Sequence, residues 1–143
     1  MNEGDKGGDA RRASPSVARN RDAIRDAFAR MVAHSGRVLE IASGTGEHGL
    51  HITAAYPELI WQPSDPDPEA RASIAAWAAS ERGQAIAAPM ALDVTVPGWA
   101  EGLGPFDAVV CINMIHIAPW AAALGLFTGA AHCLKPGGRL FLY

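Results

Sequence analysis

The sequence is poor in charge and lacks the long apolar runs of membrane proteins. Its 12 Lys and Arg residues and 15 Asp and Glu residues give a net charge of -3. Proteins that bind nucleic acid through its phosphates present a basic surface, so this balance argues against DNA or RNA as a partner. No apolar run approaches the roughly 20 residues of a membrane span, and the N-terminal residues lack the apolar core of a signal peptide. We therefore expect a cytoplasmic protein with no membrane partner.

Cysteine is scarce as well. Cys111 and Cys133 both lie in apolar segments, a setting that is typical of buried thiols rather than of a disulfide. The histidines do not combine with cysteines or carboxylates at the spacing of metal ligands, so we expect no metal site. The sequence does not indicate an oligomeric state.

The residues that are present predict one α/β domain. Residues 1–13 are rich in Gly, Asp, Lys and Arg without an apolar period, so we expect a disordered leader there and a single domain over 14–143. Periodicity predicts helices over 14–32, 49–56, 70–79 and 121–134, a short connecting helix around Trp99 and Leu103, and strands over 38–41, 59–62, 85–92, 106–112 and 139–143. This alternation is typical of a Rossmann-like, doubly wound, mostly parallel sheet in three α/β/α layers.

The most informative stretch is residues 37–49, RVLEIASGTGEHG. The apolar run over 38–41 predicts a buried strand, and Glu40 is an acid near its tip. The small residues over 42–46 allow a sharp turn and a close approach of the backbone to a ligand. Strand, turn and following helix together predict a ligand-binding loop.

Charge narrows the choice of ligand. Residues 44–49 match G-x-G-x-x-G, the pattern of dinucleotide-binding loops, but a pyrophosphate is disfavoured by Glu40 behind the loop and Glu47 within it. Opposite charges about 4 Å apart attract by on the order of 1 to 4 kcal/mol in water-like to surface-like dielectrics. S-adenosylmethionine, with its sulfonium and amino groups, therefore suits the loop better. An oxidoreductase that uses NAD stays an alternative, although we find no Tyr-Lys catalytic pair.

Acids follow the second expected strand. Asp65 comes about twenty residues after the glycine loop, where nucleotide-binding α/β units place a carboxylate on the ribose hydroxyls. The alternative for Asp65 is a turn or N-cap aspartate. We expect the cap role for Asp67, ahead of the helix that begins near Pro68.

The strand expected over 106–112 delivers two catalytic candidates, Asn113 and His116. Ligands sit beyond the carboxyl ends of parallel strands, so residues 113–116 should face the donor methyl group or the methyl acceptor. His116 titrates near neutral pH and is a candidate general base; a structural histidine is the alternative.

The pattern acid-x-small-x-Gly-x-Gly, formed by Glu40, Ala42, Gly44 and Gly46, resembles the opening motif of class I S-adenosylmethionine-dependent methyltransferases. Ala42 departs from the glycine that is usual at its position. More closely, residues 14–143 resemble the methyltransferase-like group called domain of unknown function 938, through SPSVARNRDAI, LEIASGTGEHGLHI, WQPSDPDP and INMIHIAPW. The Pro-Gly-Gly turn over 136–138 is common before strand five in these enzymes. The resemblance implies that strands six and seven, which carry much of the acceptor pocket, are absent.

The resemblance also implies roles for single residues. Asp93 would accept a hydrogen bond from the adenine amino group and Val94 would pack on the ring, with a loop-capping role as the alternative for Asp93. Arg19 and Asn20 would belong to a segment that closes over the cofactor; the alternative is a solvated helix face. His48 is expected on a helix face and could line the cofactor end of the pocket. The complete set of expected cofactor-binding residues is Arg19, Asn20, Glu40, Ala42, Ser43, Gly44, Thr45, Gly46, His48, Asp65, Pro66, Asp93, Val94, Asn113 and Met114.

These observations predict an S-adenosylmethionine-dependent methyltransferase that acts on a small-molecule acceptor and releases S-adenosylhomocysteine. Methyl transfer depends mainly on alignment and on the exclusion of water, and a base is needed only where the acceptor arrives protonated. Neither the acceptor nor its reacting atom can be read from the sequence. A module that binds S-adenosylmethionine without catalysing transfer is the main alternative.

Overall fold

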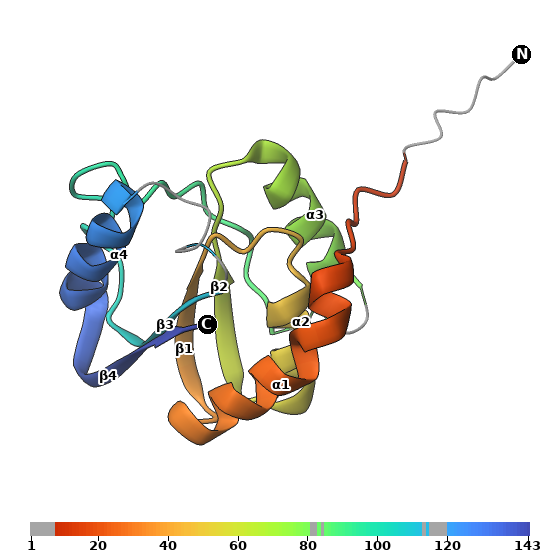
Figure 1. Cartoon of the computed structure of the whole chain (residues 1–143), viewed down its shortest axis with the longest axis horizontal. Coiled ribbons are helices and arrows are strands. Elements are labelled where there is room, and N and C mark those ends of the chain that lie inside the picture. The colour runs from red at the N-terminus through yellow and green to blue at the C-terminus, as the bar shows by residue number, and fades with distance from the viewer. Residues whose placement is uncertain (1–7, 81–82, 84, 113, 115–119) are drawn as a thin grey trace, which may run out of the picture.

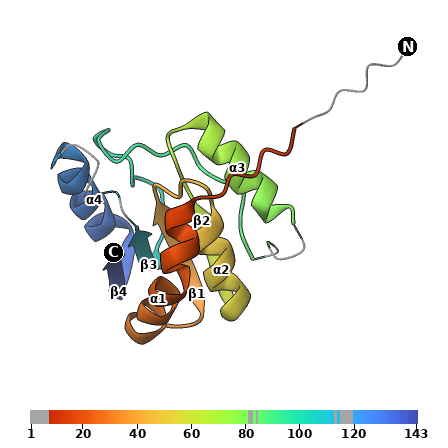
Figure 2. The ribbon, with the colours of Figure 1, turned by 45° about the vertical axis from the view of Figure 1, so that its right-hand side comes forward.

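The computed structural model describes residues 8–80, 83, 85–112, 114 and 120–143. Its elements are α1 (Pro15–Met31), β1 (Gly36–Ile41), α2 (Glu47–Ala55), β2 (Leu59–Pro63), α3 (Pro68–Ala78), β3 (Phe106–Cys111), α4 (Trp120–Cys133) and β4 (Leu134–Leu142). The strands form one parallel sheet in the order β2-β1-β3-β4. Helices α1 and α2 lie on one side of the sheet and α4 lies on the other (Figure 1, Figure 2). The predicted Rossmann-like α/β architecture is confirmed.

The strand order places β1 where the direction of winding reverses. From β1 the chain moves to β2 on one side, then crosses over to β3 and β4 on the other. In open α/β sheets, ligands bind at this reversal, beyond the carboxyl ends of the strands. The glycine loop leaves β1 at this point.

Successive side chains of β1 point to opposite faces of the sheet, so they belong to two separate clusters of the core. Val38 is buried in one cluster with Phe28 of α1 and Trp61 of β2, whereas Leu39 belongs to the cluster beneath α4. Fully burying an apolar side chain of this size stabilises the fold by about 1.5 to 3 kcal/mol. Successive residues of a strand point to opposite faces, so Glu40 lies on the face of Val38, toward α1 and α2.

The strand expected over 85–92 is present only as two isolated parallel bridges to β2, Trp61 with Ile86 and Ser64 with Met90. Alanine has a low strand propensity, and Pro89 has no N–H to donate to a ladder. The segment therefore runs beside β2 without forming a regular strand.

Two further boundaries differ from the sequence prediction. The segment around Trp99 forms successive turns rather than a helix, because Pro97 and Gly98 interrupt it. Strand β4 begins at Leu134, directly after α4, and not at residue 139. Gly137, with φ of 79°, lies where the register with β3 shifts, so the Pro-Gly-Gly sequence forms an irregularity inside the strand.

Part of the segment that we expected to be a disordered leader is packed against α3. The Arg12 N–H donates to Ser73 Oγ at 2.9 Å, and the Arg12 carbonyl accepts from Trp77 Nε1 at 2.9 Å. The Arg11 guanidinium lies over the Trp77 ring, 5.1 Å from its centroid. The leader prediction is therefore wrong for these residues, because backbone bonds to a distant helix leave no trace in local composition.

Gly49 of α2 allows this helix to approach β2 closely. A Cβ atom at position 49 would lie 2.5 Å from Nε1 of Trp61, which is fully buried. We expect Gly49→Ala to destabilise the protein by about 2 kcal/mol, because overpacking a filled core costs roughly 1 to 3 kcal/mol. Urea unfolding measures the effect, with Ala54→Ser on the exposed side of α2 as the control. Equal stability of Gly49→Ala and wild type would contradict this packing.

Cys111 and Cys133 are both free and buried, as predicted.

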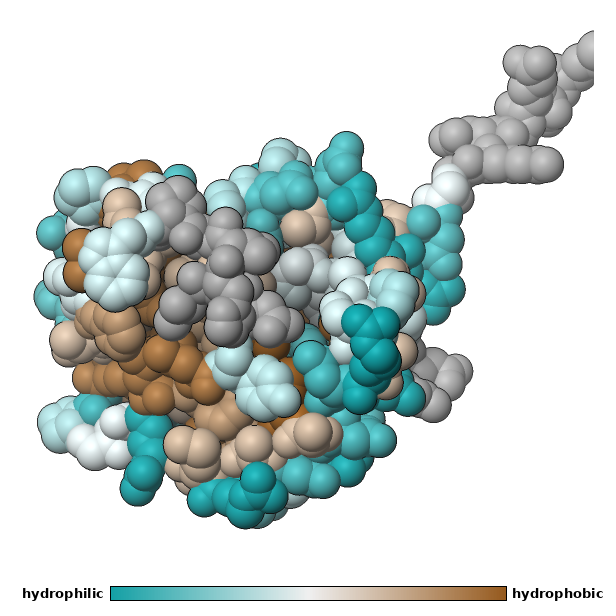
Figure 3. Space-filling model, in the orientation of Figure 1, coloured by the Kyte–Doolittle hydropathy of each residue, from teal (hydrophilic) through white to brown (hydrophobic). Residues whose placement is uncertain are grey.

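Among the described helices, none is long and apolar enough to cross a membrane. The large apolar side chains of α4 that are exposed are Trp120, Leu124 and Phe127, and apolar surface gathers over α4 and β4 (Figure 3).

Candidate functional site

The glycine loop connects β1 to α2 through residues with left-handed backbone conformations. Gly44 and Gly46 have φ of 60° and 90°, and Gly46 is the N-cap of α2. A Cβ atom at Gly46 would lie 3.0 Å from the Cα atom of Ile74 in α3, so both backbone conformation and space require glycine there. Ala42 also has a positive φ, 54°. This explains why glycine is the usual residue at that position of the motif.

The loop opens onto a cleft with two lobes, beyond the carboxyl ends of β1 and β2. The first lobe, about 360 Å³, is lined by Ser14, Ser16, Val17, Glu40, Ala42, Ser43, Gly44, Thr45, His48, Asp65, Ile112 and Met114. The second, about 240 Å³, is lined by Ile41, Ala42, Asp65, Pro66, Leu92, Asp93, Val94, Thr95, Met114 and Ala122. Ala42, Asp65 and Met114 belong to both lobes, so the two are adjacent.

Glu40 lines the first lobe and is 2% exposed. Its Oε1 atom accepts a hydrogen bond from Trp61 Nε1 at 3.1 Å. Burial raises the pKa of Glu40 to about 7, and the nearby charge of Asp65 acts in the same direction. A cation bound beside Glu40 would lower this pKa again, because an opposite charge favours the carboxylate.

His48 brings a second polar group to the first lobe. Its side chain is 7% exposed, and neither ring nitrogen has a hydrogen-bond partner among the described residues. Burial lowers the pKa of His48, so the ring is neutral and offers one donor and one acceptor. A buried polar atom without a partner costs about 1 to 3 kcal/mol, and a ligand with polar groups in this lobe would remove that cost.

Asp65 lies between the lobes and holds the loop in place. Its Oδ2 accepts from the Gly44 N–H at 3.0 Å and its Oδ1 from the Asp67 N–H at 2.9 Å. Each carboxylate oxygen has lone pairs left for a ligand hydroxyl. Asp67 is the N-cap of α3 and accepts from the Glu69 N–H, as predicted.

The second lobe combines apolar side chains with one carboxylate. Val94 is buried and Leu92 is half-buried, whereas Asp93 is exposed. Asp93 Oδ1 accepts from the Thr95 N–H at 2.9 Å and from Thr95 Oγ1 at 2.6 Å, and these bonds lower the pKa of Asp93. Asp93 thus makes the loop-capping contact that we considered as its alternative role, while it also lines the lobe.

The N-terminal end of α1 closes one side of the first lobe. Ser14, Ser16 and Val17 line it, and the Ser14 N–H donates to Glu47 Oε1 at 2.8 Å. Sequence reasoning missed these three residues, because only the Ser-Pro helix start marked the segment. The cleft lining does not include Arg19, which is exposed on α1, or Asn20, whose buried Oδ1 has no partner among the described residues.

The two catalytic candidates, Asn113 and His116, lie outside the described residues. Met114 between them is described, and it lines both lobes. The structure therefore assembles residues from the glycine loop, the end of β2, the 92–95 segment and the end of β3 around one cleft. The first lobe holds Glu40 and His48 among apolar side chains, and the second lobe is more apolar, so the cleft suits a ligand with a charged end and an apolar end.

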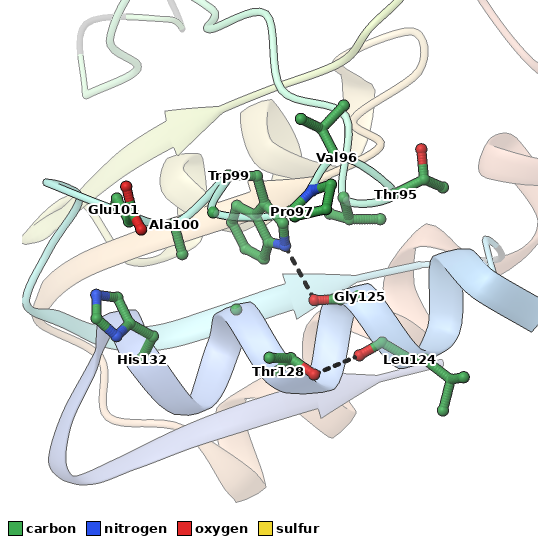
Figure 4. A pocket seen from close by; sticks show the side chains of 13 residues that line it. Thr95, Val96, Pro97, Trp99, Ala100, Glu101, Leu124, Gly125, Thr128 and His132 are labelled. Atoms are coloured by element: carbon green, nitrogen blue, oxygen red, sulfur yellow. Dashed lines mark hydrogen bonds between the residues drawn. The ribbon is translucent and has the colours of Figure 1, made fainter.

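A separate cavity of about 410 Å³ lies between the turns over 94–101 and helix α4 (Figure 4). Trp99 Nε1 donates to the Gly125 carbonyl at 2.9 Å, and Thr128 Oγ1 donates to the Leu124 carbonyl at 3.0 Å. These polar groups thus bond to the backbone of α4 rather than converging on the cavity. Of the expected site residues, only Val94 lines it, so the two-lobed cleft is the candidate site.

Comparison with known proteins shows which family the chain matches and which proteins it is similar to. The family described as "Protein of unknown function (DUF938)" matches residues 11–143. The ubiquinone biosynthesis O-methyltransferase of Xylella fastidiosa is 33% identical in an alignment 127 residues long that covers 82% of this chain and 45% of that protein. The chain thus spans less than half the length of this relative.

Solved methyltransferases share the fold. The glycopeptide N-methyltransferase MtfA complexed with sinefungin superimposes with a TM-score of 0.72 at 20% identity, over 86% of this chain and 49% of that one. An O-methyltransferase family protein from Burkholderia thailandensis gives 0.66 at 24% identity, over 87% and 41%. MtfA has also been solved with S-adenosylmethionine and with S-adenosylhomocysteine.

Proposed function

This chain belongs to the DUF938 family, and we propose from that premise that it binds S-adenosylmethionine and takes part in methyl transfer to a small-molecule acceptor. The observation that carries the proposal is the two-lobed cleft at the carboxyl end of β1, with the buried acid Glu40 in its first lobe and Asp65 between the lobes. The methyltransferase fold of the solved structures supports it. The pyrophosphate of NAD is negatively charged and would be repelled by the Glu40 carboxylate in this cleft. This repulsion disfavours the oxidoreductase alternative.

The two lobes correspond to the two ends of the ligand. We assign the amino-acid end to the first lobe, where Glu40 would attract the ammonium group and His48 offers a neutral imidazole. The adenine would lie in the second lobe against Val94, with Asp93 at its edge. Asp65, which both lobes share, would accept hydrogen bonds from the ribose hydroxyls.

The cofactor supplies an activated methyl group on a sulfonium, and displacement by the acceptor leaves a neutral thioether. The described residues contribute binding and orientation, because in-line transfer depends on alignment and on exclusion of water. The N-terminal end of α1 would shield the first lobe from solvent. Asn113 and His116 remain our candidates for orienting or deprotonating the acceptor.

The proposal of a small-molecule acceptor rests on the names of similar proteins. Two of them are named for an O-methyltransferase reaction and one for N-methylation of a glycopeptide. These names differ in the atom that is methylated, so we propose no acceptor atom. The net charge of -3 supports a partner other than nucleic acid.

Calorimetric titration of the 143-residue chain with S-adenosylmethionine, S-adenosylhomocysteine and NAD tests the proposal. We expect micromolar binding of both adenosyl ligands and no binding of NAD. Binding of NAD alone would favour the oxidoreductase alternative, and silence from all three would contradict a cofactor site in this chain. Consumption of S-adenosylmethionine in the presence of phenolic and amine acceptors then separates a methyltransferase from a module that only binds.

Asp65→Asn should weaken S-adenosylhomocysteine binding roughly 10- to 100-fold, because a hydrogen bond to a charged group contributes about 1.5 to 3 kcal/mol. The matched control is Asp67→Asn, two residues away, in which asparagine still caps α3. Titration calorimetry on both variants measures the difference. If Asp65→Asn binds as tightly as wild type, Asp65 serves only to hold the loop and the ribose assignment is wrong.

A further inference from the structure

Trp61 is the largest fully buried side chain of the protein's described part, and it belongs to the WQPSDPDP segment. It pairs with Val38 across the β1–β2 ladder, so its side chain lies on the α1 and α2 face of the sheet. Phe28 of α1 packs against it with ring centroids 6.0 Å apart. Gly49 of α2 leaves the space that its Nε1 edge occupies. The indole is therefore held from two helices.

The single polar atom of this ring points at the single buried acid of β1. Trp61 Nε1 donates to Glu40 Oε1 at 3.1 Å, and the two side chains are 0% and 2% exposed. Indole N–H is a donor only, so this bond favours a carboxylate over a protonated acid as its acceptor. Phenylalanine could fill most of the same space in the core. The hydrogen bond is what tryptophan adds.

We propose that Trp61 is the positioning residue of the cleft: its N–H orients the Glu40 side chain and favours the carboxylate form that would attract the ammonium group of the bound ligand. The orienting step stands on the contact between the two residues, whereas the benefit to the ligand rests on the proposed function. Trp61 itself does not line either lobe, so it acts through Glu40 alone.

Several groups besides Trp61 influence the charge of Glu40. The negative charge of Asp65 opposes its ionisation, and the Cys111 thiol on β3 has a pKa that burial and the charge of Glu40 raise to about 12. The Ser43 hydroxyl donates to the Glu40 carbonyl oxygen at 3.5 Å, and hydrogen bonding by the Ser43 side chain lowers the pKa of Glu40 more than the bond from Trp61 does. His48 lines the same lobe and is neutral. Trp61 is the side chain whose donor contacts the Glu40 carboxylate itself, at 3.1 Å, so its removal tests the proposal.

The test compares Trp61→Phe with Trp99→Phe. Trp99 Nε1 also donates one hydrogen bond, a part-buried one to the Gly125 carbonyl at 2.9 Å, on the opposite face of the sheet. Both variants lose one indole hydrogen bond and a similar volume. Carbon-13 NMR of the glutamate side-chain carboxyls, with Glu40 assigned through Glu40→Gln, reads the Glu40 titration directly in the absence of any ligand.

We expect the pKa of Glu40 to rise from about 7 by about one unit in Trp61→Phe and to stay unchanged in Trp99→Phe. S-adenosylhomocysteine affinity should then fall about fivefold at pH 7 and by less than twofold at pH 8.5, because the higher pH restores the carboxylate. A merely structural role would lower affinity equally at both pH values.

An unchanged Glu40 titration in Trp61→Phe would overturn the proposal. So would a loss of affinity that pH 8.5 does not recover. If wild type binds no adenosyl ligand while Trp61→Phe still shifts the Glu40 titration, the proposed function fails and the orientation of Glu40 by Trp61 stands. Where Trp61→Phe does not fold, Trp61→Leu also lacks the N–H donor and adds no titrating group, and its Glu40 titration decides in the same way.

Discussion

Glu40→Gln is expected to weaken S-adenosylhomocysteine binding at least about 30-fold at pH 8. Glutamine has the size of glutamate, and its side-chain oxygen can still accept from Trp61 Nε1. It has no charge, however, and truncating one partner of a buried charged pair costs about 2 to 5 kcal/mol. The binding free energy that Glu40→Gln loses is therefore the attraction between the Glu40 carboxylate and the ammonium group of the ligand, and titration calorimetry measures it.

The matched control is Glu58→Gln. Glu58 is exposed and precedes β2, at the edge of the sheet opposite the cleft. Glu58→Gln changes the net charge by the same amount as Glu40→Gln without changing the site, so the variant should bind S-adenosylhomocysteine as tightly as wild type. Wild-type affinity in Glu40→Gln would mean that the glycine loop binds its ligand without an acid, and the assignment of the first lobe to the amino-acid end would be wrong.

The second large effect concerns stability and pH in the absence of ligand. Burial raises the pKa of Glu40 from 4.5 to about 7. Between these values the folded chain keeps a proton that the unfolded chain has lost, so the free energy of unfolding falls as pH rises. Above about pH 7 both states are ionised and the loss is complete. One pKa unit corresponds to about 1.4 kcal/mol, so we expect a loss of about 2 to 3 kcal/mol between pH 5 and 8.

Urea unfolding of wild type and Glu40→Gln at a series of pH values isolates this contribution. The difference in stability between them should move in favour of Glu40→Gln by about 2 to 3 kcal/mol from pH 5 to 8. All other titrating groups are common to both proteins and cancel. A constant difference across this range would show that the pKa of Glu40 is not raised in the folded protein. Ligand affinity would then have no reason to depend on the protonation of Glu40 between pH 7 and 8.5.

Much of the fold follows from local pattern. Apolar runs at β1 and β3 predicted buried parallel strands, and the four helices appeared within a few residues of their expected bounds. The glycine loop and Asp67 were predictable for the same reason: positive φ angles and a helix N-cap restrict which residues fit, and both restrictions act within a few residues. Local pattern wrongly predicted a regular strand over 85–92, because contacts with β2 rather than strand propensity place this segment beside the sheet.

The candidate site was only partly predictable. Glu40, Asp65 and Val94 line one cleft. An acid near the end of an apolar run selected Glu40 and spacing from the glycine loop selected Asp65, whereas Val94 came from the resemblance to class I methyltransferases. Ser14, Ser16 and Val17 could not be selected in this way. They reach the cleft because α1 packs across α2, and no periodicity in α1 records which neighbour its first turn contacts.

The sequence by itself determined the order of strands and helices, the glycine loop and the carboxylates at the strand ends, because backbone conformation and burial act on residues close together in the chain. Only the tertiary structure decided that Trp61 donates to Glu40, that Arg12 is held on α3, and that both nitrogens of His48 lie buried in the first lobe. These contacts depend on the angle and distance between packed elements, which are set by side chains from distant parts of the chain filling one core.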